Sequence, residues 1–179
     1  PDYVGSVFEE WPDDKQQDYL RTLHPYRLPE LFADKQWNHS NRPRDIVHPN
    51  IITAVCQSHG EDEVFLKNNK YLDFQTTNDV DPRFCALLLR LGDILDFDGT
   101  RAPEILFSFA EGIPRSEEAF RKHLASNGFV YPEDPSDKEL PYSADCEEPW
   151  VEHKIRDYLN WVDQEFVVCN DLKKLCNKE

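Results

Sequence analysis

Three side chains with the chemistry of metal ligands or acid–base groups stand out in this sequence: His24, His59 and Asp93. The two histidines stand at expected helix ends, directly before Pro25 and Gly60, where an imidazole can be a ligand or a plain helix cap. Asp93 lies in an apolar stretch, where a carboxylate must be ion-paired, hydrogen-bonded or bound to a cation. Imidazole nitrogens together with a carboxylate oxygen suit a divalent transition metal, whereas pairing of Asp93 with an arginine is the simpler alternative.

The apolar stretch around Asp93 has the pattern of a central helix. Asp81 offers a side-chain acceptor to the first amides of a helix, and Pro82 tolerates the first helical position. Apolar residues then recur every three or four positions, at Phe84, Leu87, Leu88, Leu91, Ile94 and Leu95. Ala86 and Leu89 widen this stripe nearly all the way round the helix. We therefore expect a buried helix, with Asp93 where little water reaches.

The remaining periodicities and turn signals predict a mainly α-helical protein with one small β-hairpin. Besides 82–95, the expected helices are 13–24, 28–35, 49–58, 104–110, 116–126 and 149–176. Two strands, 129–131 and 140–144, flank an acidic, proline-rich loop and form the hairpin. We expect a helical domain over 1–126. Residues 127–179 then hold the hairpin and a long C-terminal helix that packs on this domain or links it to a next one.

The charge balance argues against binding to nucleic acid or to an anionic membrane surface. The chain has 20 Lys and Arg against 35 Asp and Glu, a formal net charge of -15, whereas phosphate backbones are held mainly by Lys and Arg. Such a charge attracts cations or a basic partner. No apolar run approaches the roughly 20 residues of a membrane span. The 5 cysteines, odd in number and without a Cys-x-x-Cys pair, indicate a reducing, cytoplasmic setting.

The stretch from Phe84 to Arg101 resembles the last motif of the HD-domain metal-dependent phosphohydrolases. The resemblance is to the subgroup that carries a GHKL-type (large-chaperone-like) ATPase module further along the chain. In that motif a late helix supplies a final aspartate to a metal site, and Asp93 stands at its position. Arg90, Asp96 and Arg101 also match the motif.

Other stretches resemble the same family in the same order. Leu20-Arg-Thr-Leu-His24 is similar to a first histidine helix of the form IRxxH. The stretch from Ile51 to His59 is similar to a second histidine helix. Residues 121–124 and the final helix also resemble the subgroup, so the resemblance covers most of the chain.

This resemblance implies an HD-domain-like helical bundle, of which the chain holds the C-terminal portion. It further implies that His24, His59 and Asp93 are catalytic residues and ligands of a divalent transition metal such as Mn, Fe, Co, Ni or Zn. In the family the metal polarises a phosphoryl oxygen and lowers the pKa of a bound water, so that hydroxide attacks phosphorus.

The resemblance also implies a substrate class and a partner. Arg21, Arg90 and Arg101 would hold phosphate through their planar guanidinium groups. The substrate would be a nucleotide or another phosphoester. The expected partner is a GHKL-type ATPase module in the same chain or in the same complex.

One departure from the family pattern bears on activity. No His-Asp dipeptide occurs anywhere, and no histidine precedes His24. The chain begins with Pro1 and contains no methionine, so we expect a fragment without the N-terminal helices of the domain; a degenerate family member explains the pattern equally well. The metal site is therefore conditional on the missing ligands, and enzyme activity on a His-Asp motif upstream. The alternative is a catalytically inactive HD-like regulatory or scaffold domain.

Overall fold

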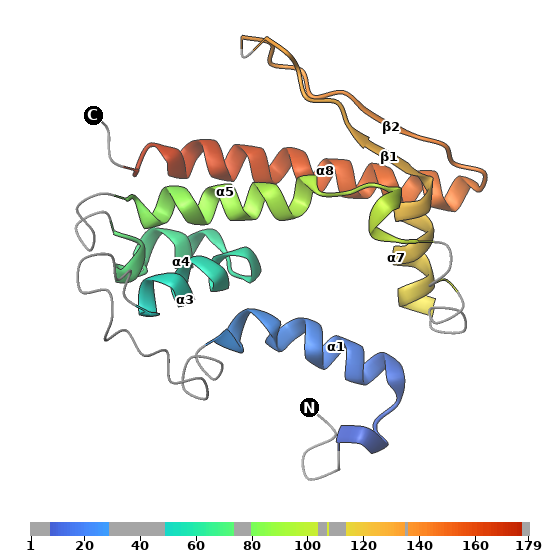
Figure 1. Ribbon diagram of the computed structural model, residues 1–179, viewed down its shortest axis with the longest axis horizontal. Helices are drawn as coiled ribbons and strands as arrows, with labels where there is room; N and C mark the ends of the chain where they lie inside the picture. The colour runs from blue at the N-terminus through green and yellow to red at the C-terminus, as the bar shows by residue number, and fades with distance from the viewer. Residues whose placement is uncertain are drawn as a thin grey trace, which may run out of the picture. The chain divides into compact units, whose positions relative to one another are not determined.

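The fold is mainly α-helical with a small antiparallel hairpin, as predicted (Figure 1). The computed structural model describes residues 8–28, 49–73, 80–103, 107, 114–134 and 136–176. The helices are α1 (Asp13–Leu23), α3 (Pro49–Gln57), α4 (Glu63–Asn68), α5 (Pro82–Leu95), α7 (Pro114–Ala125) and α8 (Pro149–Lys173). The short 3-10 helices are η1 (Phe8–Glu10), η2 (His24–Tyr26), η4 (Ser58–Gly60), η5 (Lys70–Leu72) and η7 (Gly99–Arg101). The strands are β1 (Ser126–Phe129) and β2 (Tyr142–Ala144).

Several helix starts lie at the residues that the sequence indicated. Pro49 and Pro82 begin α3 and α5, because the missing amide of proline is no loss in the first turn of a helix. α4, which lies outside the predicted helices, begins after Asp62, whose side chain accepts a hydrogen bond of 2.9 Å from the Phe65 amide. The predicted helices 28–35 and 104–110 fall outside the described residues, apart from one position in each.

The hairpin forms with a first strand that begins earlier than predicted. β1 follows α7 without an intervening loop, so it starts at Ser126 rather than at Phe129. A register irregularity between Ser126 and Gly128 lets the chain leave the helix and join the sheet. Gly128 has a φ of 86°, a left-handed conformation that glycine adopts without steric cost.

The chain divides into two compact units. Unit 1 comprises Pro1–Asp93 and Phe166–Glu179, and unit 2 comprises Ile94–Glu165. These units are not the two domains expected from the sequence, whose boundary lies between residues 126 and 127. That domain boundary stays a prediction.

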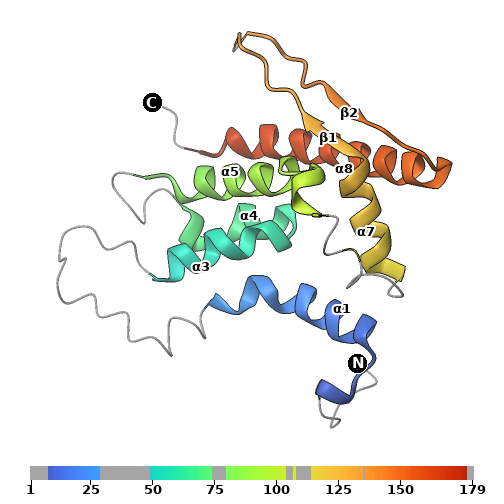
Figure 2. The same cartoon turned by 45° about the vertical axis from the view of Figure 1, so that its right-hand side comes forward.

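Unit 1 is built around one apolar cluster to which α3, α4, α5 and the end of α8 contribute. Its members are Ala54, Leu66, Leu72, Ala86, Leu87, Cys169, Leu172 and Cys176. Both views show α3, α4 and α5 side by side (Figures 1 and 2). Burial of these side chains holds α3, which leads into the turn of His59, against α5.

α5 buries one face rather than its whole circumference. Ala86 and Leu87 are 0% and 3% exposed, whereas Phe84 and Leu88 are 41% and 55% exposed. The prediction that the apolar stripe is buried nearly all round is therefore wrong. Its physical reason is that α3, α4 and α8 meet on one side of the helix, so the spacing of apolar residues overstated the covered area.

Unit 2 packs around the buried side chain of Ser126. Its hydroxyl donates to the carbonyl oxygen of Phe97 and accepts from the hydroxyl of Tyr142, both at 2.8 Å. The Phe97 ring stacks on Tyr158 with a centroid distance of 4.0 Å and lies 4.2 Å from the ring of His123. Burial lowers the pKa of His123, so its imidazole is neutral at pH 7 and packs as part of this aromatic group.

The left-handed glycine allows a direct test of the hairpin geometry. We expect Gly128→Ala to lower the free energy of unfolding by about 1–2 kcal/mol, because a Cβ would be strained at this φ and would lie 3.2 Å from the Cβ of Asp98. Urea unfolding followed by circular dichroism measures the change. Gly92→Ala in α5 is the matched control, since nothing lies within 4 Å of its added Cβ, and it should leave the protein as stable or more stable. A Gly128→Ala protein as stable as this control would contradict the assigned backbone conformation.

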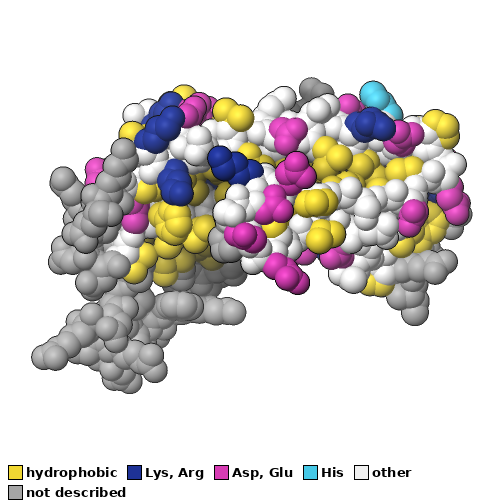
Figure 3. Space-filling view, turned by 90° about the horizontal axis from the view of Figure 1, so that it is seen from above, with side chains coloured by type: hydrophobic (Ala, Val, Ile, Leu, Met, Phe, Trp, Pro, Cys, Tyr) yellow, Lys and Arg dark blue, Asp and Glu magenta, His cyan; other side chains and the backbone are white. Residues whose placement is uncertain are grey.

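The surface carries acidic side chains over a wide area. On the face drawn in Figure 3 they are spread between basic and apolar side chains. Arg156 and Glu152 form an exposed pair at 2.7 Å within one helix, and pairs of this kind contribute little stability. None of the described helices has both the length and the apolar character needed to cross a lipid bilayer.

Candidate functional site

The two predicted site histidines meet at the ends of two helices in unit 1. α1 runs into η2, whose first residue is His24, and α3 runs into η4, whose middle residue is His59. The Nε2 atoms of the two rings lie 2.6 Å apart, and the ring centroids are 4.7 Å apart. His24 is exposed and His59 is partly exposed, so ions and small molecules can reach the pair.

The other nitrogen of each ring contacts a main-chain carbonyl. His24 Nδ1 lies 2.5 Å from the oxygen of Arg21, and His59 Nδ1 lies 2.5 Å from the oxygen of Cys56. A carbonyl oxygen can only accept, so both Nδ1 atoms carry the hydrogen. Two neutral rings would then present their Nε2 lone pairs to one another. A cation between the two nitrogens would stabilise this arrangement.

The two rings are oriented as two histidine ligands of a metal ion commonly are. Histidines that bind metals donate their other ring hydrogen to a carbonyl, carboxylate or water, which fixes the tautomer and the ring orientation. Both His24 and His59 satisfy this condition. His24 and His59 would hold such an ion through their Nε2 atoms.

η2 and η4 contact one another at two further successive positions. An added Cβ on Gly60 would lie 2.7 Å from Cγ of Pro25, so only glycine allows this approach. The hydroxyl of Tyr26 donates to Glu61, and this hydrogen bond raises the pKa of Tyr26. The contact of the two turns therefore continues beyond the histidines. These neighbours have no signature in the sequence, because no local pattern pairs residues 35 positions apart.

Arg90 holds the turn that carries His59. Its Nη1 donates to the carbonyl oxygen of Ser58 and, at 2.7 Å, to that of Glu61. Ser58 is fully buried, at 0% exposure. The expected binding of phosphate by Arg90 stays a prediction. The two hydrogen bonds show that this side chain contacts the turn that carries His59.

Asp93 is exposed, which differs from the expectation that little water reaches it. It follows Gly92, beside which an added Cβ would meet nothing within 4 Å. Within the described ranges, no group of three or more His, Cys, Asp or Glu side chains is close enough to hold a metal ion. Asp93 stands three residues after Arg90, on nearly the same side of α5. Its role as a third ligand stays a prediction.

The other two predicted phosphate-binding arginines differ in their surroundings. Arg21 is exposed in the last turn of α1, one turn before His24. Arg101 lies in unit 2, where its Nη1 donates to the carboxylate of Asp96 at 2.9 Å and to its main-chain oxygen at 3.1 Å. Arg21 thus lies one helical turn before His24, whereas Arg101 has a local carboxylate partner.

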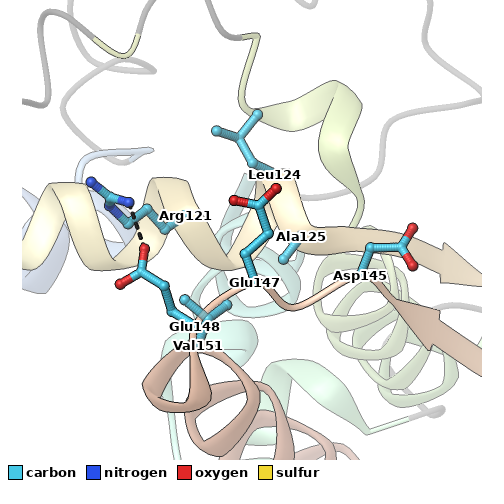
Figure 4. Close-up of a pocket in the computed structure, with 7 residues that line it drawn as sticks. All are labelled: Arg121, Leu124, Ala125, Asp145, Glu147, Glu148 and Val151. Carbon is cyan, nitrogen blue, oxygen red and sulfur yellow. Dashed lines mark hydrogen bonds and ion pairs between the residues drawn. The ribbon is translucent and has the colours of Figure 1, made fainter.

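Unit 2 contains a separate open pocket of about 440 Å³ (Figure 4). It is lined by Arg121, Leu124, Ala125, Asp145, Glu147, Glu148 and Val151. Arg121 and Glu148 point toward one another and form an ion pair of 2.8 Å, and Arg121 also bonds Glu117 at 2.9 Å. The lining holds three carboxylates and one arginine but no imidazole, so the pocket differs in its donor groups from the histidine pair.

Comparison with protein families gives one match. The family model HD-CE matches residues 4–167, a stretch that includes both site histidines, Arg90 and Asp93. Comparisons with curated proteins and with solved structures found no match.

Proposed function

Because the chain belongs to the HD-CE family, we propose that it is part of an HD-type, metal-dependent phosphohydrolase domain that acts on a nucleotide or another phosphoester. The observation that carries this proposal is the convergence of His24 and His59, whose Nε2 atoms face one another while both Nδ1 atoms lie against carbonyl oxygens. The motif resemblance and the geometry agree on these two residues.

Three residues of the chain are the proposed metal ligands. His24 and His59 supply nitrogen ligands, and their Nδ1 contacts hold each ring in the tautomer that leaves Nε2 open. Asp93 is the proposed oxygen ligand, and the proposal requires further ligands from a His-Asp motif outside residues 1–179. A bound divalent transition metal would supply a Lewis acid and an activated water for attack on phosphorus.

Phosphate binding is assigned first to Arg21. It is exposed on the turn of α1 that precedes His24, so its guanidinium can reach an anion held near the histidine pair. Arg90 and Arg101 stay candidates, although both already donate to protein oxygens. A planar guanidinium has five N–H donors in a fork that matches a phosphate group.

The second candidate function is a catalytically inactive HD-like regulatory or scaffold domain. The observation that favours it is the absence of a His-Asp dipeptide from the sequence, which removes two of the family's ligands. In either case we propose a GHKL-type ATPase module as the partner, in the same chain or complex. We also propose a cytoplasmic location, in line with the free state of Cys56, Cys85, Cys146, Cys169 and Cys176.

Metal binding and hydrolysis by the full-length protein test the two functions. The protein is freed of metal, titrated with Co²⁺ and Zn²⁺, and then assayed with Mn²⁺, Fe²⁺, Co²⁺, Ni²⁺ or Zn²⁺ on a generic phosphodiester and a nucleotide panel. Stoichiometric binding with metal-dependent release of phosphate or of a phosphomonoester supports the hydrolase. Binding without hydrolysis of any substrate favours the inactive domain, and no binding at all contradicts the metal site.

Asp93 is tested within the same experiment. We expect Asp93→Asn to weaken Co²⁺ binding at least about tenfold, because an amide oxygen is a poorer ligand than a carboxylate and carries no charge. Asp96→Asn is the matched control, since this neighbouring carboxylate pairs with Arg101. Equal Co²⁺ affinity in wild type and Asp93→Asn would remove Asp93 from the site.

A further inference from the structure

Arg90 contacts both ends of the turn that carries His59. One atom of its guanidinium, Nη1, donates to the carbonyl oxygens of Ser58 and Glu61, the residues that directly enclose His59 and Gly60. The side chain comes from α5, the helix that also carries Asp93. A single arginine therefore links two segments that the family resemblance assigns to one site.

The carbonyl groups at the end of α3 favour a cation beside them. α3 ends at Gln57, and the last carbonyl groups of a helix lack partners within the helix and carry partial negative charge. Ser58 is fully buried, so its carbonyl oxygen cannot rely on bulk water. Besides Arg90, it accepts only a long hydrogen bond of 3.3 Å from the Glu61 amide in the described hydrogen bonds. A guanidinium here satisfies the oxygen and complements the helix end.

Both the ring and the main chain of His59 are thereby held in place. Its Nδ1 contacts the oxygen of Cys56 one turn back, and Arg90 fixes the main chain before and after it. We propose that Arg90 is a positioning residue, which sets the place of His59 Nε2 opposite His24 and ties the turn to the Asp93 helix. This inference rests on the proposed function of the histidine pair as a metal site. It differs from a phosphate-binding role, in which Arg90 would touch the substrate.

The two roles of Arg90 predict different results in the absence of substrate. If Arg90 positions His59, Arg90→Gln weakens Co²⁺ and Zn²⁺ binding by about 10- to 100-fold, the usual effect of losing an outer-shell partner. Arg90→Lys recovers part of this loss, because an ammonium group can still donate to at least one of the two carbonyls. If Arg90 only binds phosphate, both variants bind metal as wild type does. Arg156→Gln, which removes an exposed arginine paired with Glu152, is the control and should bind metal normally.

A second measurement does not depend on metal. In the metal-free full-length protein, ¹H–¹⁵N spectra of the imidazoles report which ring nitrogen carries the hydrogen. Arg90→Gln should shift the His59 ring signals and leave those of His123, which lies in unit 2, unchanged. Unmoved His59 signals together with wild-type metal affinity would overturn the positioning role. If wild type binds neither Co²⁺ nor Zn²⁺, the proposed metal site fails, and the ring signals still decide whether Arg90 positions His59.

Discussion

Replacing His59 by glutamine should weaken binding of Co²⁺ and Zn²⁺ by at least about 100-fold, because losing a ligand costs more than losing its outer partner, which already costs about 10- to 100-fold. Glutamine retains a polar side chain of similar reach but has no imidazole lone pair at the Nε2 position. The ring of His59 also cannot be replaced by a neighbour, since its Nε2 is the atom that lies 2.6 Å from His24. Calorimetric titration of the full-length protein at fixed pH measures the affinities.

The partner histidine supplies an internal check. His24→Gln should cause a loss of similar size, and the double variant should be little worse than either single one, because residues that act as a unit are not additive. His153→Gln is the matched control, since this exposed histidine of α8 lies 3.7 Å from Asp157 and far outside the pair in sequence. Full affinity in His59→Gln would contradict the metal site. A single variant that binds half as many ions with unchanged affinity would show that the two rings bind ions separately.

The helical framework was predictable because its signals are local. Proline at a first helical position and apolar periodicity located α3 and α5 from their own residues. The extent of burial depends on tertiary packing, which a local pattern does not report. Periodicity cannot show that only one side of α5 is covered, and so it placed Phe84, Leu88 and Asp93 in a drier environment than the structure gives them.

The site was predictable only in its ligand-type residues. Motif resemblance named His24 and His59, and the structure brings their rings together. The contacts that surround them depend on which turns lie opposite one another in space. For this reason neither the bond between Tyr26 and Glu61 nor the two carbonyl contacts of Arg90 could be anticipated. An arginine in such a motif suggests that it binds phosphate. The same N–H groups can instead donate to the carbonyl oxygens at a buried helix end.

A second arginine of α5, Arg83, serves two other helix ends in unit 1. It is only 8% exposed. Its Nε donates to the oxygen of Leu66 at 3.0 Å and its Nη2 to that of Lys67 at 3.4 Å, both in the last turn of α4. Its Nη1 donates at 3.3 Å to the oxygen of Leu175, just after α8. One buried cation thus satisfies carbonyl groups from two elements and complements the negative ends of their helices.

Arg83→Met should therefore lower the free energy of unfolding by about 1–3 kcal/mol, because the buried carbonyl of Leu66 loses its guanidinium donor, whereas the carbonyls of Lys67 and Leu175 are only partly buried. Methionine keeps most of the aliphatic volume, so the change reports lost hydrogen bonds rather than a cavity. Urea unfolding measures it, with Arg156→Met as the control; that side chain is 71% exposed, and its loss should change stability by no more than about 0.5 kcal/mol. If Arg83→Met were as stable as Arg156→Met, water would have to reach these carbonyls, and the joining of α4 to the end of α8 would depend on the apolar cluster alone.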